Sequence, residues 1–267
     1  MYDLSEYLNF TKELAFDSGK ILSKYFGNIT IINQKSSPID LVTNADIDSE
    51  KLIINSIRKK FPDHTIITEE SHLKEKNSDF RWVIDPLDGT TNFVHNLPIF
   101  AVSIGLQYKH KTILGVVYNP AADKMFSATI KQGAHLNGDV ITSSSSNTLS
   151  ESLIVTGFPY LQDNKWENSF DIFKDFYSKS QGVRRLGAAA LDLCFVAMGR
   201  FEIFYEFNLK PWDICAGSII AQEAGATVTD WNGSAYPQSG KRILASNGHV
   251  HKEALEILKL YSSIYFN

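Results

Sequence analysis

Apolar residues recur along much of the chain with the period of a helix. Between Leu4 and Tyr25 they stand three or four positions apart, with Asp3 before them and Gly27 after them. This pattern predicts a helix over 3–26, because Asp3 can cap the first turn and glycine commonly follows the last turn. The same reasoning predicts further helices over 45–60, capped by Asn44 or Asp46, and over 164–179, 187–198, 211–224 and 249–262.

Short runs rich in apolar and β-branched residues lie between these helices and predict strands. They occupy 29–32, 65–68, 81–84, 100–108, 112–119, 123–130, 152–158, 201–207, 226–230 and 242–246. The closely spaced runs within 100–130, with Gly and Asn turns, are typical of an antiparallel meander. The serine-rich segment 142–148 predicts a surface connection, so we expect two halves of one compact unit, 1–145 and 146–267.

Composition narrows the class of protein. The 267 residues are 43% apolar and 21% charged, which is ordinary for a soluble globular protein. A net charge of −4 without a basic tract argues against nucleic acid as the main ligand. No apolar run is long enough to cross a membrane, and the amino end lacks the features of a signal peptide. Cys194 and Cys215 form no close-spaced motif, so we expect reduced thiols in a cytoplasmic protein.

The candidate chemistry centres on the residues that follow the predicted strand 81–84. That strand ends on Asp85, and Pro86 is expected to stop it there, because proline donates no backbone hydrogen bond and constrains the residue before it. Asp88 comes three residues later. Two carboxylates at a strand end can bind a hard cation such as Mg²⁺, although a solvated Asp-Pro and Asp-Gly turn is the common alternative.

The next three residues add a feature that favours a phosphate ligand. Gly89 lets the backbone approach a ligand closely, and Thr90 and Thr91 stand at a possible helix start. Backbone N–H groups at a helix start bind phosphate, and the helix dipole favours its negative charge. The stretch therefore predicts a metal site beside a phosphate site.

Further acidic residues stand at two other element ends. Glu69 and Glu70 follow the predicted strand 65–68, so Glu69 and Asp85 would share one sheet edge if the two strands are neighbours. Asp213 lies in the first turn of the predicted helix 211–224. An acidic pair after a strand can be only a charged loop, and Asp213 can simply cap its helix.

Two of these stretches resemble the signature motifs of the inositol monophosphatase family: Asp85–Phe93 (DPLDGTTNF) and Pro211–Gly217 (PWDICAG). The resemblance continues at Glu69-Glu70, at 35–43 and at 184–189, and it covers essentially the whole chain. It implies an α+β fold in αβαβα layers, as in inositol monophosphatase and fructose-1,6-bisphosphatase. It also implies a Mg²⁺-dependent, lithium-sensitive phosphomonoesterase that forms a homodimer and does not bind membranes.

The resemblance further assigns roles by position. Glu69, Asp85 and the Leu87 carbonyl would hold one Mg²⁺; Asp85, Asp88 and Asp213 would hold a second; and Glu69 would help hold a weaker third ion. Thr90, together with Glu69, would orient the attacking water, with Asp46 behind it. The substrate would contact Asp88, Gly89, Thr90, Ala189, Glu206 and Asp213. Physical chemistry agrees, because four carboxylates balance two divalent cations, which neutralise a phosphate dianion and activate water without a covalent intermediate.

The substrate is less narrowly defined by the resemblance. Glu206 stands where inositol phosphatases contact inositol hydroxyls, which favours inositol 1-phosphate, although Glu206 could simply end an edge strand. The resemblance also covers enzymes of the same fold whose substrates are histidinol phosphate, fructose 1,6-bisphosphate, NADP and adenosine 3′,5′-bisphosphate. A second phosphate would need a basic pocket, for which Arg184, Arg185 and Lys210 are candidates. Some bacterial relatives resemble adaptors in RNA synthesis. A protein with no catalytic role would be expected to have lost some of the acidic residues, whereas this chain has all of them.

Overall fold

The computed structural model describes residues 3–28, 32–34, 41–159, 166–235 and 242–261. Its α-helices are α1 Leu4–Tyr25, α2 Asn44–Lys60, α3 Thr90–Val94, α4 Trp166–Lys179, α5 Ala189–Ala197, α6 Pro211–Glu223 and α7 His251–Leu260. The amino-terminal strands are β1 Ile32–Gln34, β2 Leu41–Thr43, β3 Thr65–Thr68, β4 Phe80–Asp88, β5 Ala101–Tyr108, β6 Lys111–Asn119, β7 Lys124–Thr129, β8 Ala134–Leu136 and β9 Asp139–Ile141. The others are β10 Leu153–Thr156, β11 Gly182–Arg184, β12 Ile203–Phe207, β13 Thr227–Thr229 and β14 Arg242–Ser246.

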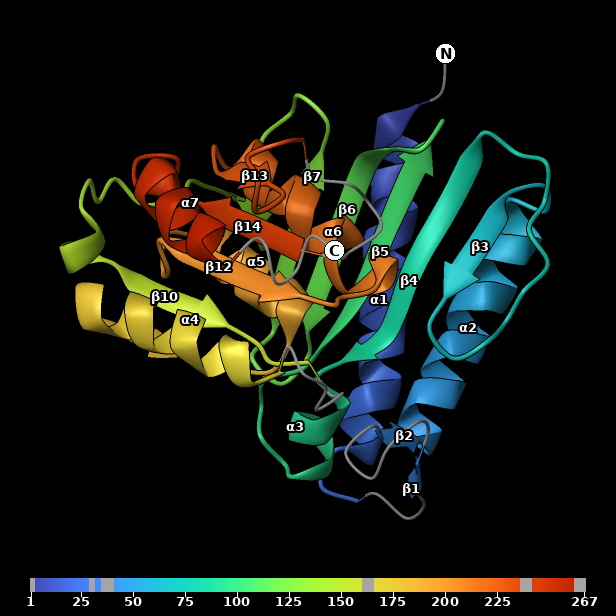
Figure 1. Ribbon diagram of the computed structural model, residues 1–267. Coiled ribbons are helices and arrows are strands. Elements are labelled where there is room, and N and C mark those ends of the chain that lie inside the picture. Colours follow the sequence, from blue (N-terminus) through green and yellow to red (C-terminus); the bar gives the residue numbers. More distant parts are fainter. Residues whose placement is uncertain (1–2, 29–31, 35–40, 160–165, 236–241, 262–267) are drawn as a thin grey trace.

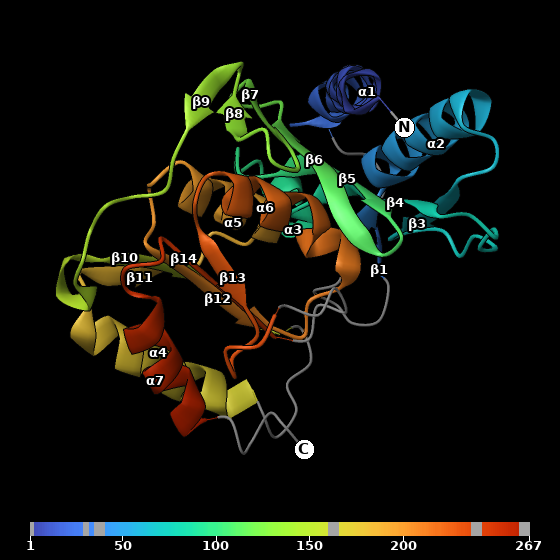
Figure 2. The ribbon, with the colours of Figure 1, turned by 90° about the horizontal axis from the view of Figure 1, so that it is seen from above.

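The larger elements form five alternating layers (Figures 1 and 2). Helices α1 and α2 cover the outer face of a sheet built from β3 to β9, and α5 and α6 cover its inner face. A second sheet, β10 to β14, packs on the other side of α5 and α6, and α4 and α7 cover its outer face. The predicted αβαβα fold is confirmed.

The first sheet is an antiparallel meander with one parallel pair at its edge. Its strand order follows the chain from β3 to β9, and only β3 and β4 run parallel. The predicted meander is confirmed and extends through β8 and β9, which were not predicted. Each has three residues beside a Gly or Asn turn, too short for an alternating pattern to stand out.

The second sheet has the order β11-β10-β12-β14-β13. Strands β11, β10 and β12 run parallel, whereas β14 and β13 are antiparallel to their neighbours. Strand β12 is therefore central, and the alternative in which Glu206 merely ends an edge strand is wrong. One apolar core contains residues from both sheets and from α5 and α6; the division at 145 stays a prediction.

Helix α6 lies unusually close to the first sheet. Gly105 and Gly115 are directly opposed on β5 and β6, and both face this helix. A Cβ on Gly105 would lie 2.5 Å from the sulfur of Cys215, and one on Gly115 would lie 2.5 Å from the Ala216 carbonyl oxygen. The two glycines therefore set how near the second turn of α6 comes to the middle of β5 and β6.

Several helix ends differ from the sequence expectations. Asp3 caps α1 as predicted, with its carboxylate accepting a hydrogen bond from the Ser5 N–H at 2.8 Å. Helix α2, however, is capped by Thr43 and not by Asn44 or Asp46; Asp46 instead bonds back to the Thr43 N–H in a capping box. The predicted strand at 29–32 lies mostly outside the described residues.

Helix α4 presents only part of its predicted face to the core: Phe176 is buried and Phe173 packs against the core, whereas Tyr177 is exposed. The spacing of the aromatic residues in this segment predicts an inward face of Trp166, Phe170, Phe173 and Phe176 or Tyr177. Ser169, Ile172 and Phe176 are the buried residues, whereas Phe170 is 47% exposed. The many aromatic residues on this helix mask its true inward stripe, because Phe170 packs on Trp166 and Phe158 near the surface.

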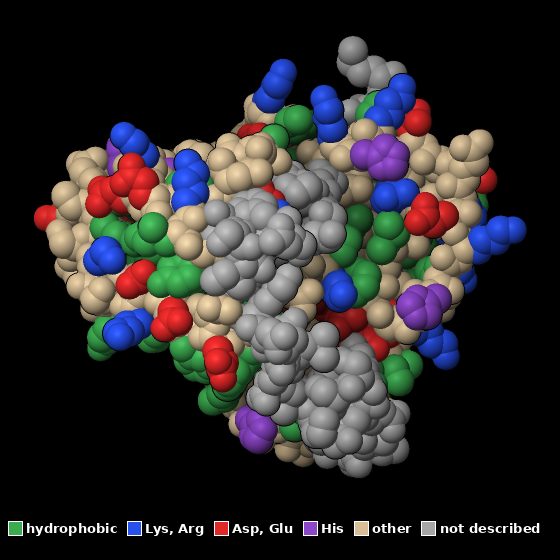
Figure 3. All heavy atoms as spheres, viewed as in Figure 1, with side chains coloured by type: hydrophobic (Ala, Val, Ile, Leu, Met, Phe, Trp, Pro, Cys, Tyr) green, Lys and Arg blue, Asp and Glu red, His purple; other side chains and the backbone are tan. Residues whose placement is uncertain are grey.

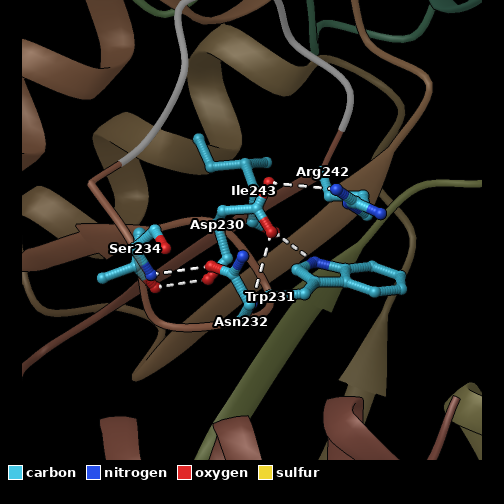
Figure 4. A network of polar contacts seen from close by, with 7 residues as sticks. Asp230, Trp231, Asn232, Ser234, Arg242 and Ile243 are labelled. Carbon is cyan, nitrogen blue, oxygen red and sulfur yellow. Dashed lines mark hydrogen bonds and ion pairs between the residues drawn. The ribbon is translucent and has the colours of Figure 1, made fainter. Parts of the chain in front are cut away.

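The turn after β13 is fixed by polar contacts (Figure 4). The Asp230 carboxylate accepts hydrogen bonds from the Asn232 N–H and from the Arg242 guanidinium, at 3.2 and 3.5 Å. The Trp231 indole donates to the Ile243 carbonyl at 2.9 Å. These bonds fasten β13 to β14 without contributing to the pocket described below. Within the described ranges, no helix is both long and apolar enough to cross a membrane.

Candidate active site

Parallel strands from both sheets end around one pocket. It measures about 100 Å³ and lies beyond the carboxyl ends of β3 and β4 on one side and of β10 and β12 on the other. Ligands commonly bind beyond the carboxyl ends of parallel strands. All the predicted site residues except Asp46 line it: Glu69, Asp85, Leu87, Asp88, Gly89, Thr90, Ala189, Glu206 and Asp213.

The first acidic pair comes from β3 and β4. These strands are parallel neighbours with Thr68 opposite Ile84, so the next residues, Glu69 and Asp85, reach the same sheet edge. The expectation that β4 stops at Asp85 is wrong. The pairing with β5 is interrupted after Asp85 and resumes at Asp88, which lies opposite Ala101. Pro86 breaks the ladder without ending the strand, and this irregularity directs both carboxylates to the pocket.

The residues after this irregularity are held by short polar contacts. The Asp85 carboxylate accepts a hydrogen bond from the Leu87 N–H at 3.0 Å. The Thr90 hydroxyl lies 3.0 Å from the Leu87 carbonyl oxygen and 3.2 Å from Asp46, able to donate to either. Asp46 itself is fully buried and also accepts from Thr43. Asp46 therefore stands behind Thr90, outside the pocket wall.

Gly89 is required at the turn into α3. Its φ is +87°, a left-handed conformation that side chains disfavour. A Cβ there would lie 2.9 Å from the Ile99 carbonyl oxygen and 3.2 Å from the Ala188 side chain. The turn at Gly89 can therefore pack against Ile99 and the segment before α5 only because residue 89 has no side chain.

Asp88 and Asp213 both lie at the amino ends of middle-layer helices. The Asp88 carboxylate accepts a hydrogen bond from the Ala190 N–H, in the first turn of α5, at 2.8 Å. Asp213 occupies the first turn of α6 and accepts from the Lys210 N–H at 2.7 Å. Asp213 thus accepts a backbone hydrogen bond at the start of the helix, as expected if it caps the helix, and it also lines the pocket. The positive ends of both helix dipoles face this acidic region.

The carboxylates raise one another's pKa values because they are buried together. Burial is the main cause for Asp85, whose pKa lies well above its ordinary value, and the charges of Glu69, Asp88 and Asp213 raise it further. Burial also raises the pKa of Asp88 to about 7, although the hydrogen bond from Ala190 opposes this. The pKa of Asp213 is raised well above its ordinary value for the same main reason. Such crowding favours protons or cations in the pocket.

The donor set fits hard cations. Four carboxylates and the Leu87 carbonyl provide only oxygen ligands, which Mg²⁺ prefers, and their uncompensated charge requires neutralisation. Across the described residues, no three acidic, histidine or cysteine side chains already enclose a point as ligands of a bound ion do. The carboxylates line an open wall, and their assignment as ligands stays a prediction.

The opposite wall is formed by the second sheet. Glu206 is 8% exposed, and burial raises its pKa to about 8; Asp213 raises it further and Arg185 lowers it. Of the three basic residues considered for a second phosphate, only Arg185 is among the described residues that line this pocket. A Cβ on Gly157 would lie 2.1 Å from the Glu206 carboxylate, so Glu206 rests directly on this glycine.

Comparisons with known proteins assign nearly the whole chain to one family. The family model described as "Inositol monophosphatase family" matches residues 3–263. The chain belongs to this family. It is 40% identical over 257 residues to an inositol-1-monophosphatase of Synechocystis, covering 96% of this chain and 90% of that protein. It is 41% identical over 251 residues to the Nus factor SuhB of Escherichia coli, covering 93% and 94% of the two chains.

A solved structure of the family has the same fold. The inositol monophosphatase of Anabaena superimposes with a TM-score of 0.86 at 38% identity, over 97% of each chain. Membership of this phosphatase family and the layered fold are therefore both shown. The comparisons leave the substrate open, because the relatives include both inositol-1-monophosphatases and proteins named SuhB.

Sequence reasoning missed several residues that shape the pocket. Gly157 and Phe158 line it, and the Asn92 side chain donates to the Ile99 and Leu186 carbonyls, which ties the turn near Gly89 to the segment before α5. Asn92 lies within the first signature motif, so its position was a usable signal. Gly157 gave none, because its importance depends on Glu206, which is 49 residues away.

Proposed function

We propose that this protein hydrolyses phosphate monoesters with the help of Mg²⁺, and that inositol 1-phosphate is its substrate. The supporting observation is the convergence of Glu69, Asp85 and Asp88 from the first sheet with Asp213 from helix α6 around one pocket. The proposal also draws on the similarity to an inositol-1-monophosphatase. A resident cofactor of two or three Mg²⁺ ions, a homodimer and a cytoplasmic location are further parts of the proposal.

Glu69, Asp85, Asp88, Asp213 and the Leu87 carbonyl would hold the ions. When bound, Mg²⁺ would neutralise the phosphate dianion and make water more acidic. The charges of Glu69, Asp88 and Asp213 all raise the pKa of Asp85, so Asp85 is near each of them, as a ligand shared by two ions would be. The raised pKa values of Asp85, Asp88 and Asp213 describe the pocket without cations, because nearby positive charge lowers the pKa of a carboxyl group.

Thr90 and Glu69 would hold the attacking water. The Thr90 hydroxyl hydrogen points to Asp46 or to the Leu87 carbonyl, so its oxygen can accept a hydrogen bond from water. Glu69 lies on the same side of the pocket and can accept the other water hydrogen. Together the two groups would aim the water oxygen at phosphorus.

The substrate would be bound from both walls. The N–H groups of Gly89 and Thr90 would donate to phosphate oxygens at the start of α3, and Asp88, Ala189 and Asp213 would border the ester. Glu206 would accept hydrogen bonds from ring hydroxyls of the leaving group. The position of Glu206 at the end of a central strand, facing the pocket, supports this role.

Phosphate release from a panel of monoesters tests the proposal. Purified protein with millimolar Mg²⁺ should release phosphate from inositol 1-phosphate faster than from histidinol phosphate, fructose 1,6-bisphosphate, NADP or adenosine 3′,5′-bisphosphate. EDTA should abolish release, and Li⁺ should inhibit it. Faster release from another monoester would reassign the substrate, whereas no release from any would refute the enzyme proposal.

A second candidate function follows from relatives named Nus factor SuhB. A corresponding role in RNA synthesis would rely on protein contacts, because positive and negative side chains are interspersed over the face seen in Figure 3 and the net charge is −4. Complementation of a bacterial strain lacking its SuhB, by this protein and by its Asp85→Asn variant, separates the two functions. Rescue by the variant would support a role that needs no catalysis.

A further inference from the structure

Helix α2 buries a polar surface beneath the pocket. Asp46, Ser49 and Glu50 lie three and four positions apart, hence on one helical face, and their exposed fractions are 0%, 0% and 4%. We call these residues the α2 polar face. Burying polar side chains destabilises a fold unless each finds a partner. Each of these does, and the partners are the segments that carry the proposed catalytic groups.

Glu50 holds the segment after β3. One carboxylate oxygen accepts hydrogen bonds from the Thr68 hydroxyl, the Glu70 N–H and the Ser71 N–H, at 2.6, 3.0 and 3.1 Å. The other accepts from the Ser71 hydroxyl at 2.5 Å. Glu69 lies within the segment that these bonds fix at both ends. Because Glu50 uses both oxygens on this segment, its contacts constrain the direction in which Glu69 leaves the strand.

Ser49 holds the irregular part of β4. Its hydroxyl donates to the Pro86 carbonyl at 2.9 Å and lies 2.6 Å from the Ser18 hydroxyl of α1. Pro86 stands between Asp85 and Leu87, where the ladder with β5 is interrupted. The contact thus replaces a missing sheet bond at the point where the chain turns toward the pocket. Asp46 completes the face through its contact with Thr90.

We propose that Glu50 and Ser49 are positioning residues, which with Asp46 hold Glu69, the Asp85–Leu87 segment and Thr90 in one relative arrangement. This inference rests on the proposed function, because it assigns those three segments to metal and water binding. One rigid helix would then set the spacing of groups from two strands and a turn. Loss of such supporting contacts typically weakens metal affinity or activity by about 10–100-fold.

Variants of Glu50 provide the test. Glu50→Ala removes all four hydrogen bonds, whereas Glu50→Gln keeps the oxygen that accepts three of them, and the Ser71 hydroxyl can turn to accept from the new amide. Ile57→Ala is the matched control, because Ile57 is fully buried on the same helix but belongs to the apolar core. Three quantities are measured for each: Mn²⁺ affinity by electron paramagnetic resonance, melting temperature in EDTA, and Mg²⁺ dependence of phosphate release.

We expect Glu50→Ala to weaken Mn²⁺ binding and raise the half-saturating Mg²⁺ concentration by about tenfold or more. Glu50→Gln should stay within about threefold of the wild type, as expected for a variant that retains most of these bonds. Ile57→Ala should lower the melting temperature while leaving Mn²⁺ affinity unchanged. Wild-type Mn²⁺ affinity in Glu50→Ala, or equal weakening in Ile57→Ala, would overturn the positioning role.

The Mn²⁺ measurement also separates this inference from the proposed function. If wild-type protein binds Mn²⁺ but releases no phosphate from any monoester, the proposed function fails and the positioning role is still tested by the variants. If the wild type releases phosphate and Glu50→Ala retains wild-type metal affinity, only the positioning role fails.

Discussion

Gly157 has no side chain, and this determines where the neighbouring Glu206 carboxylate can lie. In the parallel register of β10 and β12, Thr156 lies opposite Tyr205, so Gly157 comes beside Glu206. Strand β11 ends nearby, because Arg184 lies opposite Val155, which brings Arg185 beside Thr156, one residue before Gly157. The ends of three neighbouring strands therefore present a cation, a glycine and a carboxylate to the pocket. Because Gly157 has no Cβ, the Glu206 carboxylate can lie directly against the backbone of residue 157.

The substitution Gly157→Ala is expected to act on substrate choice. The new methyl group would overlap the Glu206 carboxylate, which is the end of a flexible side chain and can turn away without unfolding the strand. Above pH 8, where Glu206 is ionised, the loss of a hydrogen bond to this charged group costs about 1.5–3 kcal/mol, so KM for inositol 1-phosphate should rise about tenfold or more. Hydrolysis of glycerol 2-phosphate, which has no ring, should change by less than about threefold on the same reasoning.

Glu206→Gln provides the comparison for this prediction. This variant should also raise KM for inositol 1-phosphate more than KM for glycerol 2-phosphate, because it removes the charged group that Gly157→Ala displaces. Equal losses on both substrates in steady-state kinetics would show that Gly157 supports the fold or the phosphate and not the leaving group.

Residues with a local signal could be predicted from the sequence, and those with distant partners could not. Asp85, Asp88, Gly89 and Thr90 stand together, and the pocket contains all of them. Glu50 gave no signal, because its partners near Ser71 are about 20 residues away and its charge looks like that of any exposed helical residue.

At the scale of elements, helix α6 combines two functions at its first turn. One oxygen of Asp213 accepts the hydrogen bond from the Lys210 N–H, while the residue lines the pocket with Asp85 and Asp88. The capping and ligand interpretations of Asp213 are therefore compatible in geometry, and a substitution that keeps one and weakens the other can separate them.

Asp213→Asn is that substitution. Asparagine can still accept the bond from Lys210 and caps a helix about as well, so the melting temperature in EDTA should change little. A neutral side chain removes one of four negative charges near the proposed ions, so kcat should fall by about 10²-fold or more and Mg²⁺ affinity should weaken. Steady-state kinetics over a Mg²⁺ series measures both; unchanged turnover and Mg²⁺ dependence would return Asp213 to a purely capping role.

Long elements were predictable and short ones were not, for physical reasons. Helices such as α1 and α2 repeat their apolar period over 22 and 17 residues. Strands β8, β9 and β11 have three residues each and are defined by their neighbours rather than by their own pattern. The continuation of β4 beyond Pro86 was missed for the same reason, because the resumed pairing of Asp88 depends on Ala101.

For the whole molecule, the buried carboxylates make stability depend on pH. Without metal, the pKa of Asp88 is about 7 and that of Glu206 about 8, above the values of about 4 for carboxyl groups in an unfolded chain. At pH values between the unfolded and the folded pKa values, the folded protein keeps protons on these carboxyl groups that the unfolded chain releases. The free energy of unfolding therefore falls as pH rises from about 5 to 8.

We expect the melting temperature in EDTA to be lower at pH 8 than at pH 5.5, and Mg²⁺ to raise it more at pH 8, because cations bind the deprotonated carboxylates. Scanning calorimetry across this range, with and without Mg²⁺, measures both effects. Glu206→Gln should flatten the upper part of the EDTA curve. A melting temperature in EDTA that rises steadily from pH 5.5 to 8 would contradict the assignment.

The layers themselves could not be derived from the hydrophobic pattern alone. Periodicity predicts which residues face inward, but not that α5 and α6 would be covered by sheets on both sides. Their small residues are consistent with that position, and the opposed Gly105 and Gly115 allow the close approach of α6. The resemblance to a known family provided the arrangement that the pattern left open.

The division of the pocket between two sheets has a consequence for how the protein is made. Strands β3 to β9 all lie before residue 142, whereas Glu206 and Asp213 belong to the last third of the chain. Synthesis proceeds from the amino end, so the acidic ends of β3 and β4 leave the ribosome long before the opposite wall exists. A nascent or truncated chain that stops before α6 lacks Asp213 and the helix turn that borders the pocket. The proposed catalytic site is therefore completed only after α6 has been synthesised and has packed against the first sheet.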